Sequence, residues 1–258
     1  MIKTIKTMSK QEKERYTVPR KVQDVIPVRR IWPDGIFLTG NRFSKTYRFS
    51  DINYLVASRE DKESMFLTYS ELLNSLDSGA VTKITINNRR LNKANFETSI
   101  LMPIQGDFRD EYRGEYNQML LDKATGANGI MQEKYITVSV VKKDVEEARA
   151  YFARVGADLI SHFAALGSKC VELDATERLR ILHDFYRQGE ESEFVFNARE
   201  MMKRGHSFKD YICPDGIEKN SDYLKLGDKF CRVLFLKDYA SYIKDNMVTE
   251  LTDFNRNL

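Results

Sequence analysis

The order of strand and helix patterns constrains the fold of this chain more than any other feature. Two amphipathic helix patterns, at 58–79 and 144–167, each lie between segments with the alternating or β-branched pattern of strands. The order β-α-β therefore occurs twice along the chain. A less regular segment, 88–132, separates the two units.

The first unit opens with a predicted hairpin. Its strands, 36–39 and 42–49, flank the turn pair Gly40-Asn41. Side chains alternate along the second strand, so that one face carries Phe43, Lys45, Tyr47 and Phe49 and the other carries Arg42, Ser44, Thr46 and Arg48. We expect the second face to be open to solvent, as in antiparallel sheets with one wet side.

Capping residues mark the ends of the predicted helices. Each N-terminus pairs a Ser or Asp with an acid three residues later, and each helix stops at a glycine. The pairs are Ser58 with Asp61, Asp144 with Glu147, and Asp174 with Glu177, and the stops are Gly79, Gly167 and Gly189. Strands are predicted at 81–86, 134–141 and 170–173, the first of them ended by Asn87-Asn88.

These elements predict an α+β protein whose architecture is a ferredoxin-like split βαβ sandwich with an insertion and a C-terminal α/β extension. We expect a basic N-terminal tail at 1–33, the ferredoxin-like domain at 34–189 with its insertion at 88–132, and the extension at 190–258.

The two less regular parts carry weaker patterns. Tyr112, Tyr116, Met119 and Leu120 indicate a helix in the insertion that ends before Gly129. In the extension we expect a hairpin that turns at Gly227-Asp228, a strand at 233–236 and a short helical piece after it.

Composition places the chain among folded, non-exported proteins. Hydrophobic residues make up 42% and charged residues 31%, which supports a packed core. No apolar run approaches the roughly 18 residues of a membrane-spanning helix, and the N-terminus lacks the apolar stretch of a secretory signal. Cys170, Cys213 and Cys231 contain no C-x-x-C pair, so we expect a reducing, cytoplasmic compartment and no metal site.

Basic charge gathers at the N-terminus. Residues 1–35 hold nine bases and four acids, a net charge of +5 against −2 for the rest. Such a segment could bind an anionic lipid surface, nucleic acid or an acidic protein. Acids interleave with the bases, so a solvated tail is the alternative.

The search for nucleotide-binding motifs finds one imitation. The string GNRFSKT at Gly40 has Lys45 and Thr46 of a Walker A loop but no glycine before the lysine, and it lies in a hairpin pattern. We therefore expect no nucleotide site there and no cofactor in this chain.

Other polar residues are weaker candidates for chemistry. His162 or His183 could act as a base poised by burial, although boundary histidines usually serve structure. Glu146 with Glu147, or Glu190 with Glu191 and Glu193, would form an acid/base pair only if the fold brought them into one cleft. For a partner contact we select Arg29, Arg30 and Trp32, since Arg and Trp are enriched at interface hot spots. The alternative for Trp32 is packing over the first strand.

Four long stretches, which together span most of the chain, resemble the amino-terminal region of conjugal-transfer ATPases of type IV secretion systems, especially those of conjugative transposons. They are SDINYLVASREDKESMFLTYSELLNSLDSGAVTKITINNRRLN, EYNQMLLDKATGANGI, DLISHFAALGSKCVELDATERLRILHDFYR and KDYICPDGIEKNSDYLKLGDKFCRVLFLKDYASYIKDNM. These are non-periodic strings, which makes the resemblance specific.

The resemblance implies a non-catalytic docking and assembly domain whose parent continues into a P-loop motor. ATP and magnesium would bind only in that motor, because this chain ends before any Walker segment and no nucleotide-site residue carries over to it. Implied partners are inner-membrane channel subunits and further copies of the protein, with a peripheral location at the inner face of the cell membrane. The alternative function is a nucleic-acid-binding module that uses the basic tail.

Overall fold

The computed structural model describes residues 19–54, 56–90, 101–126, 130–191, 193–235, 237–238 and 241–242. Helices and strands mix along the described chain. The helices are α2 (Val22–Val25), α3 (Arg59–Asn74), α5 (Asp110–Gly126), α6 (Val145–Ala165), α7 (Ala175–Tyr186), α8 (Ala198–Arg204) and the 3-10 helix η1 (Phe208–Tyr211). The strands are β1 (Val28–Ile31), β2 (Phe37–Thr39), β3 (Arg42–Phe49), β4 (Val81–Arg90), β5 (Ile130–Val141), β6 (Cys170–Glu172), β7 (Ile217–Lys219), β8 (Leu224–Leu226) and β9 (Lys229–Cys231).

A six-stranded antiparallel sheet forms the centre of the molecule. Its order is β1-β2-β3-β5-β4, and β6 pairs with the second half of β3. The predicted hairpin is confirmed, because β2 pairs with β3 across Gly40 and Asn41. The predicted hairpin at Gly227-Asp228 is also confirmed, within the separate antiparallel sheet β7-β8-β9. The mixed α+β class is therefore correct.

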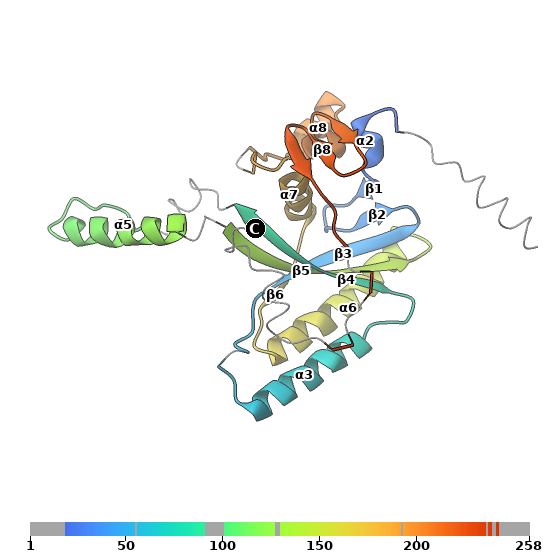
Figure 1. Ribbon diagram of the computed structural model, residues 1–258. Coiled ribbons are helices and arrows are strands. Elements are labelled where there is room, and N and C mark those ends of the chain that lie inside the picture. Colours follow the sequence, from blue (N-terminus) through green and yellow to red (C-terminus); the bar gives the residue numbers. More distant parts are fainter. Residues whose placement is uncertain are drawn as a thin grey trace, which may run out of the picture.

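Helices cover both faces of the large sheet. Helices α3 and α6 lie on one face and α7 on the other, with the small sheet and α8 beyond α7 (Figure 1). The prediction of a wet second face on β3 is wrong, because Ser44 and Thr46 are buried. Helix α7 covers them and places the guanidinium of Arg178 against the carbonyl oxygen of Ser44 at 2.7 Å.

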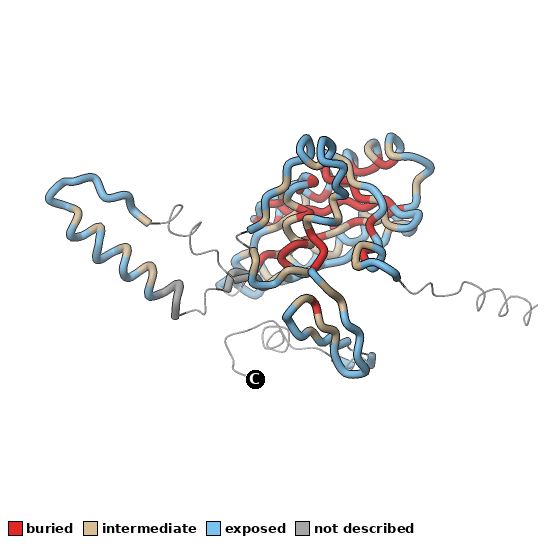
Figure 2. Tube along the Cα trace, turned by 90° about the horizontal axis from the view of Figure 1, so that it is seen from above, coloured by how far each residue is buried: buried red, intermediate tan, exposed pale blue. Residues whose placement is uncertain are grey.

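Two apolar cores result from this arrangement. The first lies between the sheet and α6, with Tyr47, Val138 and Phe152 at its centre. The second lies between α7, the β1-β2 edge and the C-terminal segment, with Phe37, Leu179 and Ile212 at its centre. Figure 2 shows that the buried residues gather in the body of the molecule and that none lies along residues 110–122, the part of α5 whose burial is described.

The predicted helix starts are confirmed by their hydrogen bonds. Ser58 Oγ, Asp144 Oδ1 and Asp174 Oδ1 each accept from the backbone N–H three residues later, at 3.1, 2.9 and 2.8 Å. Of these three helices, α7 alone has the reciprocal bond, from the Asp174 N–H to Glu177; in α6, Glu147 accepts from the N–H of Lys143 instead of that of Asp144. The third helix ends at Tyr186, three residues before the predicted stop.

Several predicted boundaries need correction. Strand β4 continues past 88 and β5 begins before 132, because Arg89 pairs with Met131 and Arg90 with Ile130 in the same ladder. The insertion therefore leaves the sheet after Arg90 and returns at Ile130.

Both ends of the chain also differ from expectation. Residues 22–31 of the predicted tail form α2 and β1, and Ile26 and Val28 are buried in the second core. Residues 1–18, which hold five of the nine bases, lie outside the described residues. The predicted strand at 233–236 is wrong for 233–235, which are exposed and without strand structure, and Leu236 lies outside the described residues, as do 127–129 and most of 237–258.

Within the described ranges, none of the helices combines the length and the apolar character needed to cross a bilayer.

Candidate functional site

The segment 101–126, here called the arm, projects from the tip of the β4-β5 pair (Figure 1). Its first residues fold back along α5. Asn117 fixes this loop with two hydrogen bonds to the backbone of Met102, accepting from its N–H at 2.8 Å and donating to its carbonyl oxygen at 2.9 Å. The arm is therefore a structured hairpin of loop and helix.

A cluster of charged side chains connects the preceding loop to the first turn of α5. The carboxylate of Asp110 accepts from the backbone N–H groups of Gln105 and Gly106, at 3.1 and 2.6 Å. Arg113 donates to Asp107 and Asp110, both at 2.5 Å. The hydrogen bond from Arg113 holds the pKa of the Asp107 carboxyl below its usual range. The hydrogen bond from the backbone N–H of Gln105 is the chief cause of the same shift at Asp110.

An apolar stripe runs along the arm at helical spacing. Its members are Tyr112, Tyr116 and Met119, which lie three or four residues apart in α5, and Phe108, which lies in the turn just before the helix. Phe108 is 82% exposed and Tyr112 69%. Such a stripe is what a helix uses to bind an apolar groove, since residues at this spacing share one face. The stripe is the strongest candidate for an interaction surface.

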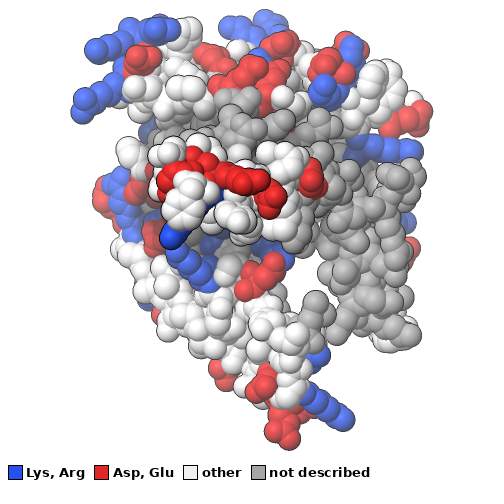
Figure 3. Space-filling view, turned by 90° about the vertical axis from the view of Figure 1, so that its left-hand side faces the viewer, with Lys and Arg blue, Asp and Glu red and all other residues white. Residues whose placement is uncertain are grey.

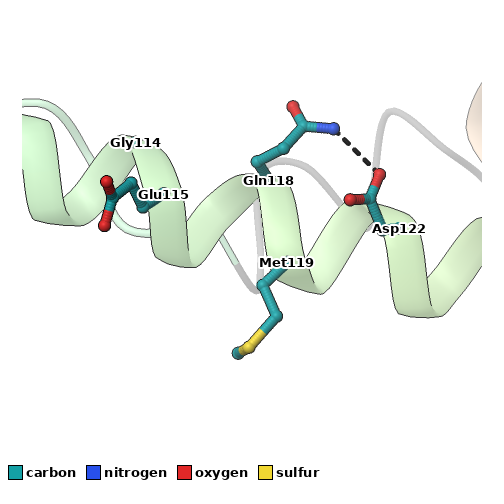
Figure 4. A pocket seen from close by; sticks show the side chains of 5 residues that line it. All are labelled: Gly114, Glu115, Gln118, Met119 and Asp122. Carbon is teal, nitrogen blue, oxygen red and sulfur yellow. Dashed lines mark hydrogen bonds between the residues drawn. The ribbon is translucent and has the colours of Figure 1, made fainter.

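Acidic residues outnumber basic ones along the arm, five to three. Figure 3 looks along the arm from its projecting end and shows a band of acidic side chains across it. The acids of this segment are Asp107, Asp110, Glu111, Glu115 and Asp122. Figure 4 shows that the side chains around Gly114 point outward, with Gln118 donating to Asp122 at 2.9 Å and Met119 pointing away from that pair. This surface is shallow and holds no enclosed ligand site.

A second candidate is the cleft of about 390 Å³ between α7 and the sheet. Its floor carries Thr46, Thr137 and Lys83, which lie side by side on β3, β5 and β4. The hydroxyls of Thr46 and Thr137 are 2.9 Å apart and bond to each other. Phe185 and Tyr186 of α7 form its apolar side.

Arg178 lies buried at the inner end of this cleft. It donates to the carbonyl oxygens of Gly35 and Ser44, both at 2.7 Å, and its guanidinium stacks 4.0 Å from the ring of Phe37. No carboxylate of the described chain lies within ion-pair distance of it. Burial lowers the pKa of Arg178 to about 9, so the side chain remains charged at neutral pH. Its contacts join α7 to the β2-β3 hairpin, which is a structural role.

A polar network lies beside that cleft. Tyr135 donates to the buried carboxylate of Glu133 at 2.7 Å, and Arg180 lies 3.7 Å from Glu133 and 3.4 Å from Asp184. Burial, followed by the bond to Glu133, raises the pKa of Tyr135. Arg180 therefore bridges two buried acids, and Arg48, 3.8 Å from Glu133, is a second basic partner of that carboxylate.

The predicted partner residues lie on one edge of the sheet. Arg29 and Arg30 are exposed on β1, while Trp32 is half-buried and its ring lies 5.8 Å from that of Phe43. Trp32 packs against the first core, which agrees with the alternative interpretation of this residue as a packing residue. Binding of a partner through Arg29 and Arg30 stays a prediction.

The other polar candidates do not converge on one place. Lys45 is buried in an ion pair with Glu172, and Thr46 lies on the opposite face of β3. His183 is buried against Phe194, with ring centroids 5.1 Å apart, whereas His162 lies in the last turn of α6. These positions bring no histidine and nucleophile together.

The predicted acid/base carboxylates serve local structure instead. Glu146 pairs with Arg149 at 2.5 Å and Glu190 with Arg187 at 3.3 Å. Glu147 and Glu191 accept from the backbone N–H groups of Lys143 and Gly189. The three cysteines are free thiols, and the described part of the chain contains no group of three or more potential metal-ligating side chains.

Sequence reasoning missed the two most distinctive features of this surface. The stripe was visible as Tyr112, Tyr116 and Met119, but the pattern alone does not tell a buried helix face from an exposed one. Arg178 lies directly beside the buried Leu179 in the sequence, but so does Arg180, which is only partly buried, so no sequence signal singles Arg178 out.

No protein-family model matches the chain, and no curated protein sequence matches it significantly.

Proposed function

We propose that this chain is a non-catalytic docking and assembly domain of a conjugative DNA-transfer ATPase of the type IV secretion class, and that the arm is its docking surface. The proposal rests on the resemblance of its four long sequence stretches to such ATPases. The exposed stripe of the arm carries the structural part of the argument, because apolar side chains gathered on a projecting element mark interaction sites.

The partner that fits the arm is an apolar groove with a basic rim. Phe108, Tyr112 and Met119 would fill the groove, while Glu111 and Glu115 would meet the rim. We propose that an inner-membrane channel subunit supplies this groove, which places the protein at the cytoplasmic side of the cell membrane as a peripheral component.

The strand order also supports a ferredoxin-like architecture. The strands β6-β3-β5-β4 are antiparallel neighbours in that order, and the crossover helices α3 and α6 lie on one face of the sheet. In this proposal the arm is an insertion in the central hairpin, and α7 with residues 190–258 is an extension that covers the second face.

Photo-crosslinking tests the docking proposal. A benzophenone amino acid at Tyr112, introduced into the gene in donor cells that carry the transfer apparatus, should crosslink to a channel subunit. The same group at Met202, equally exposed on α8, should not. Crosslinks at both positions, or at neither, would contradict docking through the arm.

Transfer frequency gives a second readout. Replacing Tyr112 and Met119 by serine should lower DNA transfer by at least about tenfold, the effect of losing roughly 1.4 kcal/mol of binding. Met202→Ser is the matched control and should transfer normally. Normal transfer by the arm variant, made in normal amounts, would rule the arm out.

The domain should have no ATPase activity of its own. Lys45 and Thr46, the Walker-like pair, are engaged with Glu172 and Thr137 on opposite faces of β3. We expect the purified chain to neither bind nor hydrolyse ATP in the presence of magnesium. Magnesium-dependent turnover that co-purifies with the chain and is lost in Lys45→Ala would overturn the proposal.

A nucleic-acid-binding module remains the second candidate, since Arg29 and Arg30 are exposed beside each other on β1. Binding of this kind would weaken steeply as salt rises. Arg29→Ala with Arg30→Ala should reduce both the affinity and its salt dependence. Binding unaffected by these substitutions and by removal of residues 1–18 would exclude the basic N-terminal region as the contact.

A further inference from the structure

The large sheet ends in a long free edge. Strand β4 pairs with β5 on one side, and no strand of the described chain pairs with its other side. At roughly 3.4 Å per residue, its ten residues present an edge about 34 Å long. Alternate N–H and C=O groups along this edge point away from β5 and can pair with another strand.

The opposite edge of the sheet is protected in the ways expected of a soluble protein. Strand β1 has four residues, its register shifts between Val28 and Arg30, and Pro27 precedes it. Arg29 and Arg30 are exposed along it. Short length, irregular register and charge all discourage strand addition. The β4 edge carries Lys83, but the five residues after it are uncharged.

Apolar side chains line the β4 edge. Ile84 and Ile86 point to the face that α6 covers further in, since Ile84 pairs with the buried Ile136. Nevertheless Ile84 is 46% exposed and Ile86 39%. Helix α6 packs on β3 and β6 and leaves this outer row uncovered. A further strand would cover both side chains.

We infer that two copies of this chain pair through β4, antiparallel, about a two-fold axis at Thr85. A two-fold axis perpendicular to the sheet keeps each face continuous and places one residue opposite itself. With Thr85 at the centre, Ile84 of each copy lies opposite Ile86 of the other, so the interface contains two such isoleucine pairs. Lys83 then lies opposite Asn87 of the second copy, so no like charges meet.

Neighbouring registers fit less well. A centre at Lys83 places two lysines opposite each other, and a centre at Ile86 places Lys83 opposite Arg89 of the second copy. A centre at Ile84 forms one isoleucine pair in place of two. The side-chain pattern of β4 therefore selects Thr85.

The arm leaves the edge free for this pairing. It lies beyond the Arg90 end of β4 and projects past the strand pair (Figure 1). In the paired sheet the two arms would project from opposite ends. An interface made of one strand pair and its flanking side chains is small, so we expect a dimer in the micromolar range. This inference concerns copies of the chain alone and holds whether or not the arm docks on a channel subunit.

Sedimentation velocity tests the pairing. The chain should pass from monomer to dimer between roughly 1 and 100 µM, the range of small interfaces. Ile84→Lys and Ile86→Lys, each at an exposed position, should remain folded and monomeric throughout. Val195→Lys, at a more exposed apolar side chain away from this edge, should dimerise normally. A chain that is monomeric at all concentrations, or a dimer that survives both lysine substitutions, would overturn the inference.

Disulfide trapping tests the register. In a background with Cys231→Ser, the buried Cys170 and Cys213 remain as the other thiols. Thr85→Cys should form a disulfide-linked dimer under mild oxidation, because residues directly opposite in an antiparallel pair lie about 4.5–5.5 Å apart. Val195→Cys is the control for random collision. A Thr85→Cys rate no higher than that of Val195→Cys would refute pairing about Thr85.

Discussion

At the scale of single residues, Gly35 occupies a point where the backbone of another segment leaves no room for a side chain. Its φ is +79°, and a Cβ atom there would lie 2.0 Å from the carbonyl oxygen of Leu173. Gly40, in the β2-β3 turn, also has a positive φ of +60° but has open space around it. The two glycines share a backbone conformation and differ only in the neighbouring atoms.

This difference predicts unequal effects of alanine. Gly40→Ala should lower the free energy of unfolding by about 1–2 kcal/mol, the usual cost of left-handed backbone for an L residue. Gly35→Ala adds an overpacking cost of about 1–3 kcal/mol and should either unfold the chain or lower its stability well beyond the Gly40 variant. Urea unfolding followed by circular dichroism measures both. Equal losses would show that the turn around Gly35 shifts freely.

Arg178 gives the second residue-scale prediction. Arg178→Met keeps much of the side-chain volume but removes the donors to Gly35 and Ser44. We expect a loss of about 3 kcal/mol, because buried acceptors left without donors cost roughly 1–3 kcal/mol each. Arg59→Met removes only the exposed pair with Glu63 and should change stability by less than about 0.5 kcal/mol. An Arg178→Met variant with unchanged stability would mean that water replaces the guanidinium as the donor.

At the scale of elements, the structure of the arm is held by the charged cluster at the start of α5 rather than by burial of apolar side chains. Asp110 accepts from two backbone N–H groups of the loop, and these bonds require the carboxylate form. Because the pKa of Asp110 is lowered from 3.8 in the folded arm, its contribution is fully present above that value and is lost as the pH falls through the folded pKa.

Hydrogen exchange of the Gln105 and Gly106 amides should report this loss. Their protection, corrected for intrinsic exchange, should fall below about pH 4 while that of α6 amides persists. In Asp110→Asn the two amides should already exchange several-fold faster at pH 7. Protection that stays constant between pH 6 and pH 3 would contradict this role for the Asp110 carboxylate.

The elements also show what sequence patterns can and cannot predict. Helix α6 was predictable because its cap and its apolar spacing are both local. The face of β3 with Ser44 and Thr46 was not, because its burial depends on α7, a helix more than a hundred residues away. Val233 and Leu234 have the composition of a strand, but no strand of the described chain pairs with them. The arm's stripe was visible, whereas its exposure was not.

At the scale of the whole molecule, the two cores share one hairpin. Phe37 of β2 lies in the second core, and Phe43 of β3 lies in the first. Arg178 ties α7 to both strands, because it stacks on Phe37 of β2 and donates to Ser44 of β3. Neither core can therefore open without moving the strand pair on which the other is built.

We expect a single unfolding transition for the described body. Phe152→Ala in the first core and Leu179→Ala in the second should each cost about 2–5 kcal/mol and should lower the same transition temperature. Scanning calorimetry should give equal calorimetric and van't Hoff enthalpies in all three proteins. Two resolved transitions, with only one shifted by each substitution, would show that the cores are independent.

The place where the arm joins the sheet has a consequence for how such proteins can diversify. Arg90 and Ile130 are cross-strand partners, so the chain leaves and re-enters the ladder at adjacent points. The segment between Arg90 and Ile130 is equivalent to a hairpin turn for the rest of the fold, because β4 and β5 already fix both of its ends. The arm can therefore be lengthened, shortened or exchanged for another segment without any change in the scaffold, and grafting it onto the turn of an unrelated hairpin should transfer the docking that we propose for it.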